Sequence, residues 1–353
     1  MSQLACANPS LFRAECTPAF ARTNAAGAGA AIRNVAIPRA SARGRRLPQL
    51  HDGLFLTDGG LETTAIFHDG IDLPCNAAFM LLRGEDGRDW LRRYYRRYLS
   101  IAATAGRGFV FETPTWRASP DWAWQLDVSF VELDELNARA VLLMREIAVD
   151  AAAGVPYVIS GCVGPRRDGY APDLAMTARE AADYHRRQLA VFASSGVDFA
   201  TATTMTNSAE AIGIASAAGT LGLPVAVSFT VETDGKLPTG QPLGDAIREV
   251  DAALAVPPAY YMINCAHPTH FAGVLDSGED WVRRVRGLRA NSSCRSHAEL
   301  DASPTLDAGD PSQLAREHGA LLARHPQLAV LGGCCGTDHR HVEAIAQACA
   351  IAA

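Results

Sequence analysis

Short runs of strand-favouring residues alternate with longer segments of helical periodicity from residue 54 to the end of the chain. Segments 90–105 and 130–153 repeat apolar residues every three or four positions and stop at Gly106 and Gly154, as helices commonly do. The pattern therefore predicts repeated strand–helix units. The eight expected strands are 54–57, 108–111, 157–160, 197–202, 225–230, 260–264, 285–290 and 328–331.

A (β/α)8 barrel, or TIM barrel, is closed by eight parallel strands, which is the number expected here. Helix starts support the division, because Thr177 with Glu180 forms a capping-box pattern and Asp310 precedes Pro311 as an N-cap precedes a first-turn proline. A doubly wound open sheet is the competing fold, but no G-x-G-x-x-G turn follows any expected strand. We therefore predict a single TIM barrel, of the α/β class, over residues 49–353.

The first 48 residues are predicted to lie outside that barrel. They are rich in Ala, Arg and Ser, contain neither Asp nor Lys, and lack a sustained hydrophobic period. Their composition fits a disordered extension or a targeting segment. Residues 1–50 carry seven Arg and one Glu, a local charge of +6. Because the whole chain has a formal net charge of -6, residues 51–353 carry -12.

Composition narrows the function class. An acidic body argues against nucleic acid as a partner. No run of about eighteen apolar residues is present, so no membrane span is expected. Nine cysteines, an odd number at low density, fit a reducing compartment, and we expect a cytoplasmic protein.

Two adjacent cysteines, Cys334 and Cys335, lie in the glycine-rich segment 331–338. Neighbouring Cα atoms are about 3.8 Å apart, less than the roughly 4.4 Å that an unstrained disulfide needs, so the pair is poorly placed to bond to itself. Cys265 follows the sixth expected strand, and Cys334 and Cys335 follow the eighth. The carboxyl ends of barrel strands share one rim, so three thiolates are expected to converge there on a metal such as zinc.

Six short motifs carry a resemblance to the homocysteine S-methyltransferase family, the zinc-thiolate barrels related to betaine-homocysteine methyltransferase and to the homocysteine domain of methionine synthase. The resemblance runs from about residue 54 to the C-terminus. It is most specific in the combination of Asn-Cys with a distant Gly-Gly-Cys-Cys-Gly-Thr. The motifs are DGG at 58–60, TPTWRAS at 113–119, SGCVGP at 160–165, VSFT at 227–230, INC at 263–265 and GGCCGT at 332–337.

The resemblance implies a Zn2+ ion on Cys265, Cys334 and Cys335, with a substrate thiol, most simply homocysteine, as the fourth ligand. Zinc would hold that thiol as a nucleophilic thiolate, which attacks a methyl group on a sulfonium, a betaine-like ammonium or a corrinoid. With homocysteine as acceptor the product is methionine. A corrinoid route is expected to need a separate corrinoid protein, because we identify no second domain for cobalamin.

The resemblance also assigns substrate-binding residues. Asp58 would bind the amino group of the substrate, with Gly59 and Gly60 offering backbone contacts. Trp116 would line the side of the methyl donor, where a cation over an indole face is favourable. Asn264, beside the first cysteine, is expected to contribute to the same pocket.

The chain departs from the family after the fourth strand. There the family commonly places Glu-Thr, and here the residues are Thr203 and Thr204. Losing the carboxylate removes a charge-assisted hydrogen bond of about 1.5–3 kcal/mol. Either another group replaces it, with Glu232 and Glu112 as candidates, or the acceptor is a different thiol. If homocysteine fits poorly for this reason, Thr203→Glu should improve its use.

Two other classes of function stay open at this point. A zinc hydrolase would use metal-bound water, but such sites usually take histidine and carboxylate ligands. A non-catalytic thiol-binding zinc protein would keep the cysteines and lose donor binding. The oligomeric state is not encoded in any pattern that we recognise.

Overall fold

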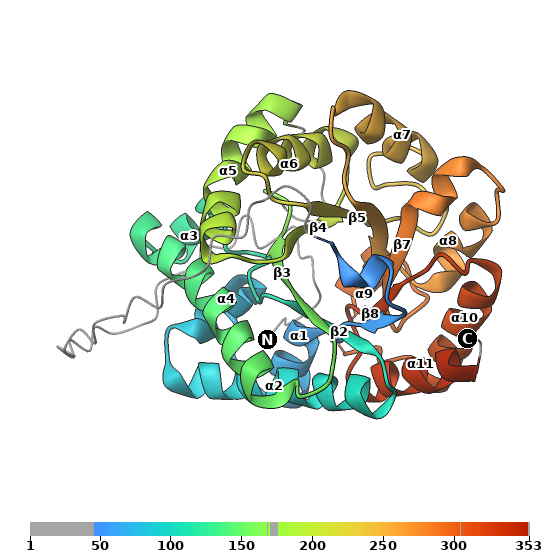
Figure 1. Cartoon of the computed structure of the whole chain (residues 1–353), viewed down its shortest axis with the longest axis horizontal. Helices are drawn as coiled ribbons and strands as arrows, with labels where there is room; N and C mark the ends of the chain where they lie inside the picture. The colour runs from blue at the N-terminus through green and yellow to red at the C-terminus, as the bar shows by residue number, and fades with distance from the viewer. Residues whose placement is uncertain (1–45, 168, 170–175, 304, 352–353) are drawn as a thin grey trace.

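The computed structural model describes residues 46–167, 169, 176–303 and 305–351, and it confirms the predicted TIM barrel. Eight parallel strands close in chain order, each hydrogen-bonded to the next and β8 to β1, with helices around them (Figure 1). The strands are β1 (Phe55–Leu56), β2 (Gly108–Glu112), β3 (Tyr157–Val163), β4 (Phe199–Met205), β5 (Val225–Phe229), β6 (Tyr260–Asn264), β7 (Val285–Ala290) and β8 (Val330–Gly333).

The helices connect the strands and cover the barrel from outside. Predicted starts are confirmed at α5, where Thr177 and Glu180 form a capping box, and at α10, where Asp310 accepts a backbone hydrogen bond. The α-helices are α1 (Leu61–Thr63), α2 (Glu85–Thr104), α3 (Pro120–Gln125), α4 (Phe130–Ala151), α5 (Ala178–Ser195), α6 (Ser208–Thr220), α7 (Leu243–Ala253), α8 (Pro268–Leu275), α9 (His297–Asp301), α10 (Pro311–Arg324) and α11 (His339–Ile351). Further short helical turns are η2 (Pro48–Leu50), η3 (Thr64–His68), η4 (Pro74–Asn76), η5 (Ala78–Leu82) and η6 (Asp280–Arg284).

The barrel interior changes from apolar to polar along the strands. An apolar cluster, separate from the larger core between strands and helices, fills the end where the strands begin. Side chains two positions apart share a face of a strand. Val158 in this cluster is therefore followed on the inside by Ser160, which meets Thr201 of β4 at 2.7 Å. The cluster contains Leu47, Phe55, Val110, Val158, Phe199, Ala226, Tyr260, Met262 and Val330.

None of the helices in the described part of the chain has the combined length and apolar character that crossing a membrane requires.

Leu47 belongs to the apolar cluster although it precedes the predicted domain boundary at residue 49. Its side chain is 5% exposed, so the segment that enters the barrel core begins at or before Leu47. The extension expected from the sequence falls almost entirely on residues 1–45, which lie outside the described residues.

We predict that deleting residues 2–45 leaves the melting temperature unchanged, because the sequence assigns that segment no part in the core. Deleting residues 2–48 should lower it by an amount on the order of 5 °C, since a buried leucine contributes about 1.5–3 kcal/mol. Calorimetry of the two truncations beside the full chain measures this. Equal melting temperatures for the two truncations would contradict the role of Leu47.

Candidate active site

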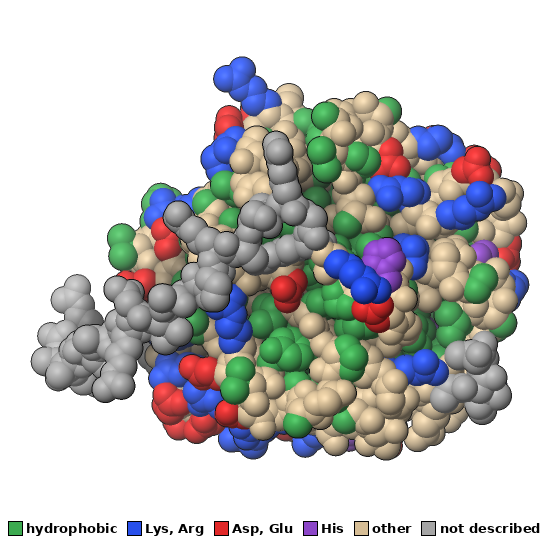
Figure 2. Space-filling view, in the orientation of Figure 1, with side chains coloured by type: hydrophobic (Ala, Val, Ile, Leu, Met, Phe, Trp, Pro, Cys, Tyr) green, Lys and Arg blue, Asp and Glu red, His purple; other side chains and the backbone are tan. Residues whose placement is uncertain are grey.

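A pocket lies among the loops that follow the strands, and it encloses about 690 Å³, including solvent at its mouth. The carboxyl ends of the strands are where the active sites of barrel enzymes form. Charged and histidine side chains interrupt the hydrophobic surface near the middle of the face in Figure 2. Predicted site residues that line the pocket are Asp58, Gly59, Gly60, Trp116, Thr203, Cys265, Cys334 and Cys335.

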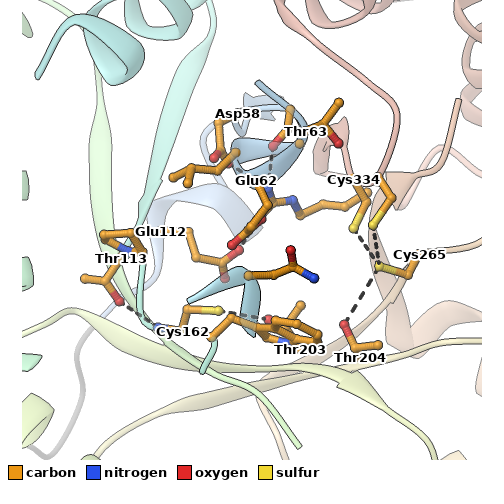
Figure 3. Close-up of a pocket in the computed structure, with 18 of the residues that line it drawn as sticks. Asp58, Glu62, Thr63, Glu112, Thr113, Cys162, Thr203, Thr204, Cys265 and Cys334 are labelled. Atoms are coloured by element: carbon orange, nitrogen blue, oxygen red, sulfur yellow. Dashed lines mark hydrogen bonds and ion pairs between the residues drawn. The ribbon is translucent and has the colours of Figure 1, made fainter. Parts of the chain in front are cut away.

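The three cysteines meet on one side of this pocket. The Cys265 sulfur lies 2.7 Å from that of Cys334 and 3.7 Å from that of Cys335. Figure 3 shows Cys265 and Cys334 facing each other, away from the carboxylates of the pocket. Among the described residues they form the one cluster of this kind able to hold a metal, with ligand atoms all within 4.8 Å. The predicted convergence of the three side chains is confirmed.

A backbone turn aims Cys265 at its partners. Asn264 ends β6, and Cys265 has a φ of +54°, a left-handed conformation that is unfavourable for a residue with a side chain. His297 holds this turn: its Nε2 lies 2.6 Å from the Cys265 carbonyl, and its Nδ1 lies 3.1 Å from a Glu232 carboxylate oxygen. Burial lowers the pKa of His297, but these two acceptors raise it more, so the net shift is upward.

Asn264 lies beneath the pocket rather than in its lining. It is fully buried, its Oδ1 accepts from the Ser228 hydroxyl at 2.6 Å and from the Thr204 backbone N–H at 2.9 Å, and its Nδ2 donates to the Thr204 hydroxyl at 2.8 Å. Thr204 has a φ of +63°. Asn264 therefore fixes a second left-handed turn, and its contact with substrate stays a prediction.

The loops after β1 and β8 fit closely together around Cys334. A Cβ on Gly60 would lie 2.7 Å from the Cys334 carbonyl oxygen, so only glycine allows this approach. The Thr337 hydroxyl donates to the same carbonyl at 2.7 Å and accepts from the Gly60 N–H at 3.1 Å. Gly336 completes the turn with a φ of +79°. The two glycine motifs are therefore needed for packing, whatever they contribute to substrate binding.

Arg289, which the sequence analysis missed, bridges two acidic residues on the other side of the pocket. Its Nη2 lies 2.7 Å from Asp58, and its Nη1 is ion-paired with Glu112. The second oxygen of Asp58 accepts from the Tyr94 hydroxyl at 3.0 Å. Burial raises the pKa of Asp58, and Arg289 and Tyr94 oppose that shift. Each oxygen of Asp58 thus already accepts one hydrogen bond, and its binding of a substrate amino group stays a prediction.

The two suggested replacements for the carboxylate missing at Thr203 both have partners of their own. Glu112 is paired with Arg289, and Glu232 binds His297 and does not line the pocket. Thr203 itself lies in the lining, where its hydroxyl is 3.6 Å from the Cys162 sulfur. Burial raises the pKa of Cys162 well above its ordinary value, so this thiol is protonated at neutral pH.

Trp116 lines the pocket as predicted, and its indole Nε1 has no hydrogen-bond acceptor among the described residues. The Arg117 guanidinium lies 4.5 Å from the Trp116 ring centroid and 3.7 Å from that of Trp122. Stacking against both rings restricts the indole, which presents a rigid aromatic wall to the pocket.

Glu62 is a second pocket residue that the sequence analysis missed. It is half-buried, lines the pocket from α1, and is drawn beside Asp58 and Glu112 in Figure 3. Burial, with a smaller contribution from the charge of Asp58, raises its pKa from 4.5 to about 7. An acidic residue two positions after the Asp58–Gly60 turn was the available signal.

Comparison with known proteins shows one consistent likeness. A family model described as homocysteine S-methyltransferase matches residues 55–349. Homocysteine S-methyltransferase 4 of Zea mays is 27% identical over 316 residues, covering 84% of this chain and 89% of that protein. Two structures of the Escherichia coli homocysteine methyltransferase MmuM share the fold. The metallated form has a TM-score of 0.65 and 18% sequence identity, and the match covers 84% of this chain and 96% of that one. The oxidised form has a TM-score of 0.68 and 20% sequence identity, and the match covers 85% of this chain and 97% of that one.

The raised pKa of Glu62 predicts a pH-dependent stability. Between pH 4.5 and about 7 the folded protein keeps this proton and the unfolded chain releases it, so the contribution of Glu62 to stability falls as pH rises through that window. Glu62→Gln should therefore gain stability relative to the wild type between pH 5 and pH 8. Denaturant midpoints measure the difference, with Glu135→Gln, an exposed glutamate, as control. An identical difference at both pH values would contradict the shift.

Proposed function

The chain belongs to the homocysteine S-methyltransferase family and is a methyltransferase, and we propose that it transfers a methyl group from an activated donor to the sulfur of homocysteine, giving methionine. The observation that carries this proposal is the three-cysteine cluster in the wall of a pocket lined also by carboxylates and an indole. The match to a family model over residues 55–349 supports the reaction class, and the pocket supports a small-molecule substrate.

The cysteine cluster fits a zinc ion. Sulfurs bound at about 2.3 Å around a tetrahedral zinc lie about 3.8 Å apart. The sulfurs of Cys265 and Cys335 are 3.7 Å apart, which matches this distance. The sulfurs of Cys265 and Cys334 are 2.7 Å apart, so they must move apart by about 1 Å when zinc binds. Cys335, like Cys265 and Cys334, can bind zinc only as a reduced thiolate. Bound zinc would keep a substrate thiol deprotonated at neutral pH.

The residues around the cluster would position the two reactants. His297 holds the turn that directs the Cys265 side chain toward the other two cysteines, and Asn264 holds the turn at Thr204. Trp116 would offer the methyl donor an aromatic face, which favours a sulfonium or quaternary ammonium group, and an N–H for which no described residue is an acceptor. Holding acceptor and donor in line supplies much of the rate acceleration in such a displacement.

We predict that the reduced protein binds close to one zinc per chain and that Cys334→Ala loses most of it, because two thiolates hold zinc much more weakly than three. The fold should survive, since barrel closure does not depend on this side chain. Metal analysis after dialysis measures the loss, with the exposed Cys294→Ala as control. Full zinc occupancy in Cys334→Ala would refute the ligand assignment.

The zinc-loaded protein is expected to form methionine from homocysteine and at least one methyl donor. The donors to test are S-methylmethionine, S-adenosylmethionine, betaine and a methylated corrinoid, with methionine followed by mass spectrometry. Turnover in Cys334→Ala should be at least a hundredfold lower, as expected when the group that activates the nucleophile is lost. Absence of methionine with every donor, from protein that holds zinc, would refute the proposed reaction.

A further inference from the structure

Glu62 is the acidic residue of the pocket lining that forms no ion pair with a described residue, although the charges of Arg289 and Arg117 act on it from a distance. The carboxylates of Asp58 and Glu112 share Arg289, whereas no ion pair or side-chain hydrogen bond joins Glu62 to any other described residue. The side chain nevertheless lines the same pocket as Cys265 and Cys334 (Figure 3).

Arg289 cannot serve Glu62 without abandoning its present partners. Its Nε donates to the Gly333 carbonyl at 3.1 Å, and its Nη1 and Nη2 engage Glu112 and Asp58. Moving it would leave two buried carboxylates unpaired, which is strongly unfavourable. With its carboxylates ionised, the triad of Asp58, Arg289 and Glu112 carries a net charge of -1, and Arg289 is the one arginine or lysine among the described residues that line the pocket with Glu62.

A carboxylate in this setting is stabilised by a positively charged ligand group, and its hydrogen-bond chemistry selects among such groups. An ammonium has N–H donors for both carboxylate oxygens, which makes a short, charge-assisted pair. The charged centre of a sulfonium or a quaternary ammonium has no N–H, and it gains more from the Trp116 face. The charge of Glu62 therefore suits an acceptor that bears an ammonium better than it suits the methyl-carrying centre of a donor.

We propose that Glu62 binds the ammonium group of the thiol acceptor and so selects an amino-acid thiol over a thiol without an amino group. Resting on the proposed function, this inference supplies the negative charge that Thr203 lacks, from α1 instead of β4. It also removes the need for Asp58 to contact substrate, since Asp58 then serves to hold Arg289.

The test pairs two proteins with two thiols. Wild type and Glu62→Gln, both zinc-loaded, are titrated calorimetrically with homocysteine and with 4-mercaptobutanoate, which differs only by lacking the amino group. Glutamine keeps the size of the side chain and removes its charge. We expect Glu62→Gln to bind homocysteine about 10- to 100-fold more weakly, and to bind 4-mercaptobutanoate within about threefold of wild type. Zinc content and melting temperature report on folding, and Glu135→Gln is the matched surface control.

Equilibrium binding separates this inference from the proposed reaction. If wild type binds both thiols equally, or if Glu62→Gln weakens both equally, Glu62 does not recognise the ammonium, whether or not methyl is transferred. Equal weakening would instead indicate that Glu62 acts on the thiol or on the pocket as a whole. Absence of methionine with the homocysteine preference intact would refute the reaction and leave the recognition standing.

Thr203→Glu gives an independent check. If Glu62 already binds the ammonium, a second carboxylate adds an unpaired charge to the pocket and should raise the KM for homocysteine severalfold. A lower KM for homocysteine in Thr203→Glu would show that the position on β4 was the one in need of a charge and would overturn the assignment to Glu62.

Discussion

Closure of the barrel between β8 and β1 is the constraint on which the site depends. The pairing of Phe55 with Val330 brings the loops at the two ends of the fold together. Gly60 can then lie against the Cys334 carbonyl, and Thr337 joins both loops through its hydroxyl. Because the cysteine loop follows β8 and the acidic turn follows β1, closure sets sulfur and carboxylate groups across one small pocket.

The balance of charge across that pocket is a second constraint, and it determines which ligand groups the site favours. A buried carboxylate without a partner costs several kcal/mol, and Arg289 offsets this for Asp58 and Glu112. Three thiolates on a divalent zinc would carry a net charge of -1, so zinc does not neutralise the remaining excess. The pocket thus has the electrostatic character of a site for a cationic group, and Glu62 is the lining carboxylate that forms no ion pair with a described residue.

Local strain marks the residues that complete the site. Thr204 and Cys265 both take left-handed backbone conformations directly after inward-facing strand positions. Successive side chains of a strand point to opposite faces. If β6 continued as a strand through Cys265, this side chain would therefore point away from the barrel interior that Asn264 faces. Asn264 and His297 supply hydrogen bonds that hold the two turns. We infer that their main effect is on the position of the metal-binding and lining groups rather than on substrate directly.

The amino-acid sequence by itself determined the repeated strand–helix units, the helix caps at Thr177 and Asp310, and the placement of three cysteines at one rim. Periodicity, capping and strand ends are set by neighbours in the chain, so they can be deduced from residues close in sequence. Only the tertiary structure decided which side chains that are distant in the sequence come into contact. Arg289 reaches Asp58 across 231 positions, Glu232 turns to His297, and Leu47 enters the barrel core. Such partners depend on side chains that barrel closure brings together, and no local pattern encodes that choice.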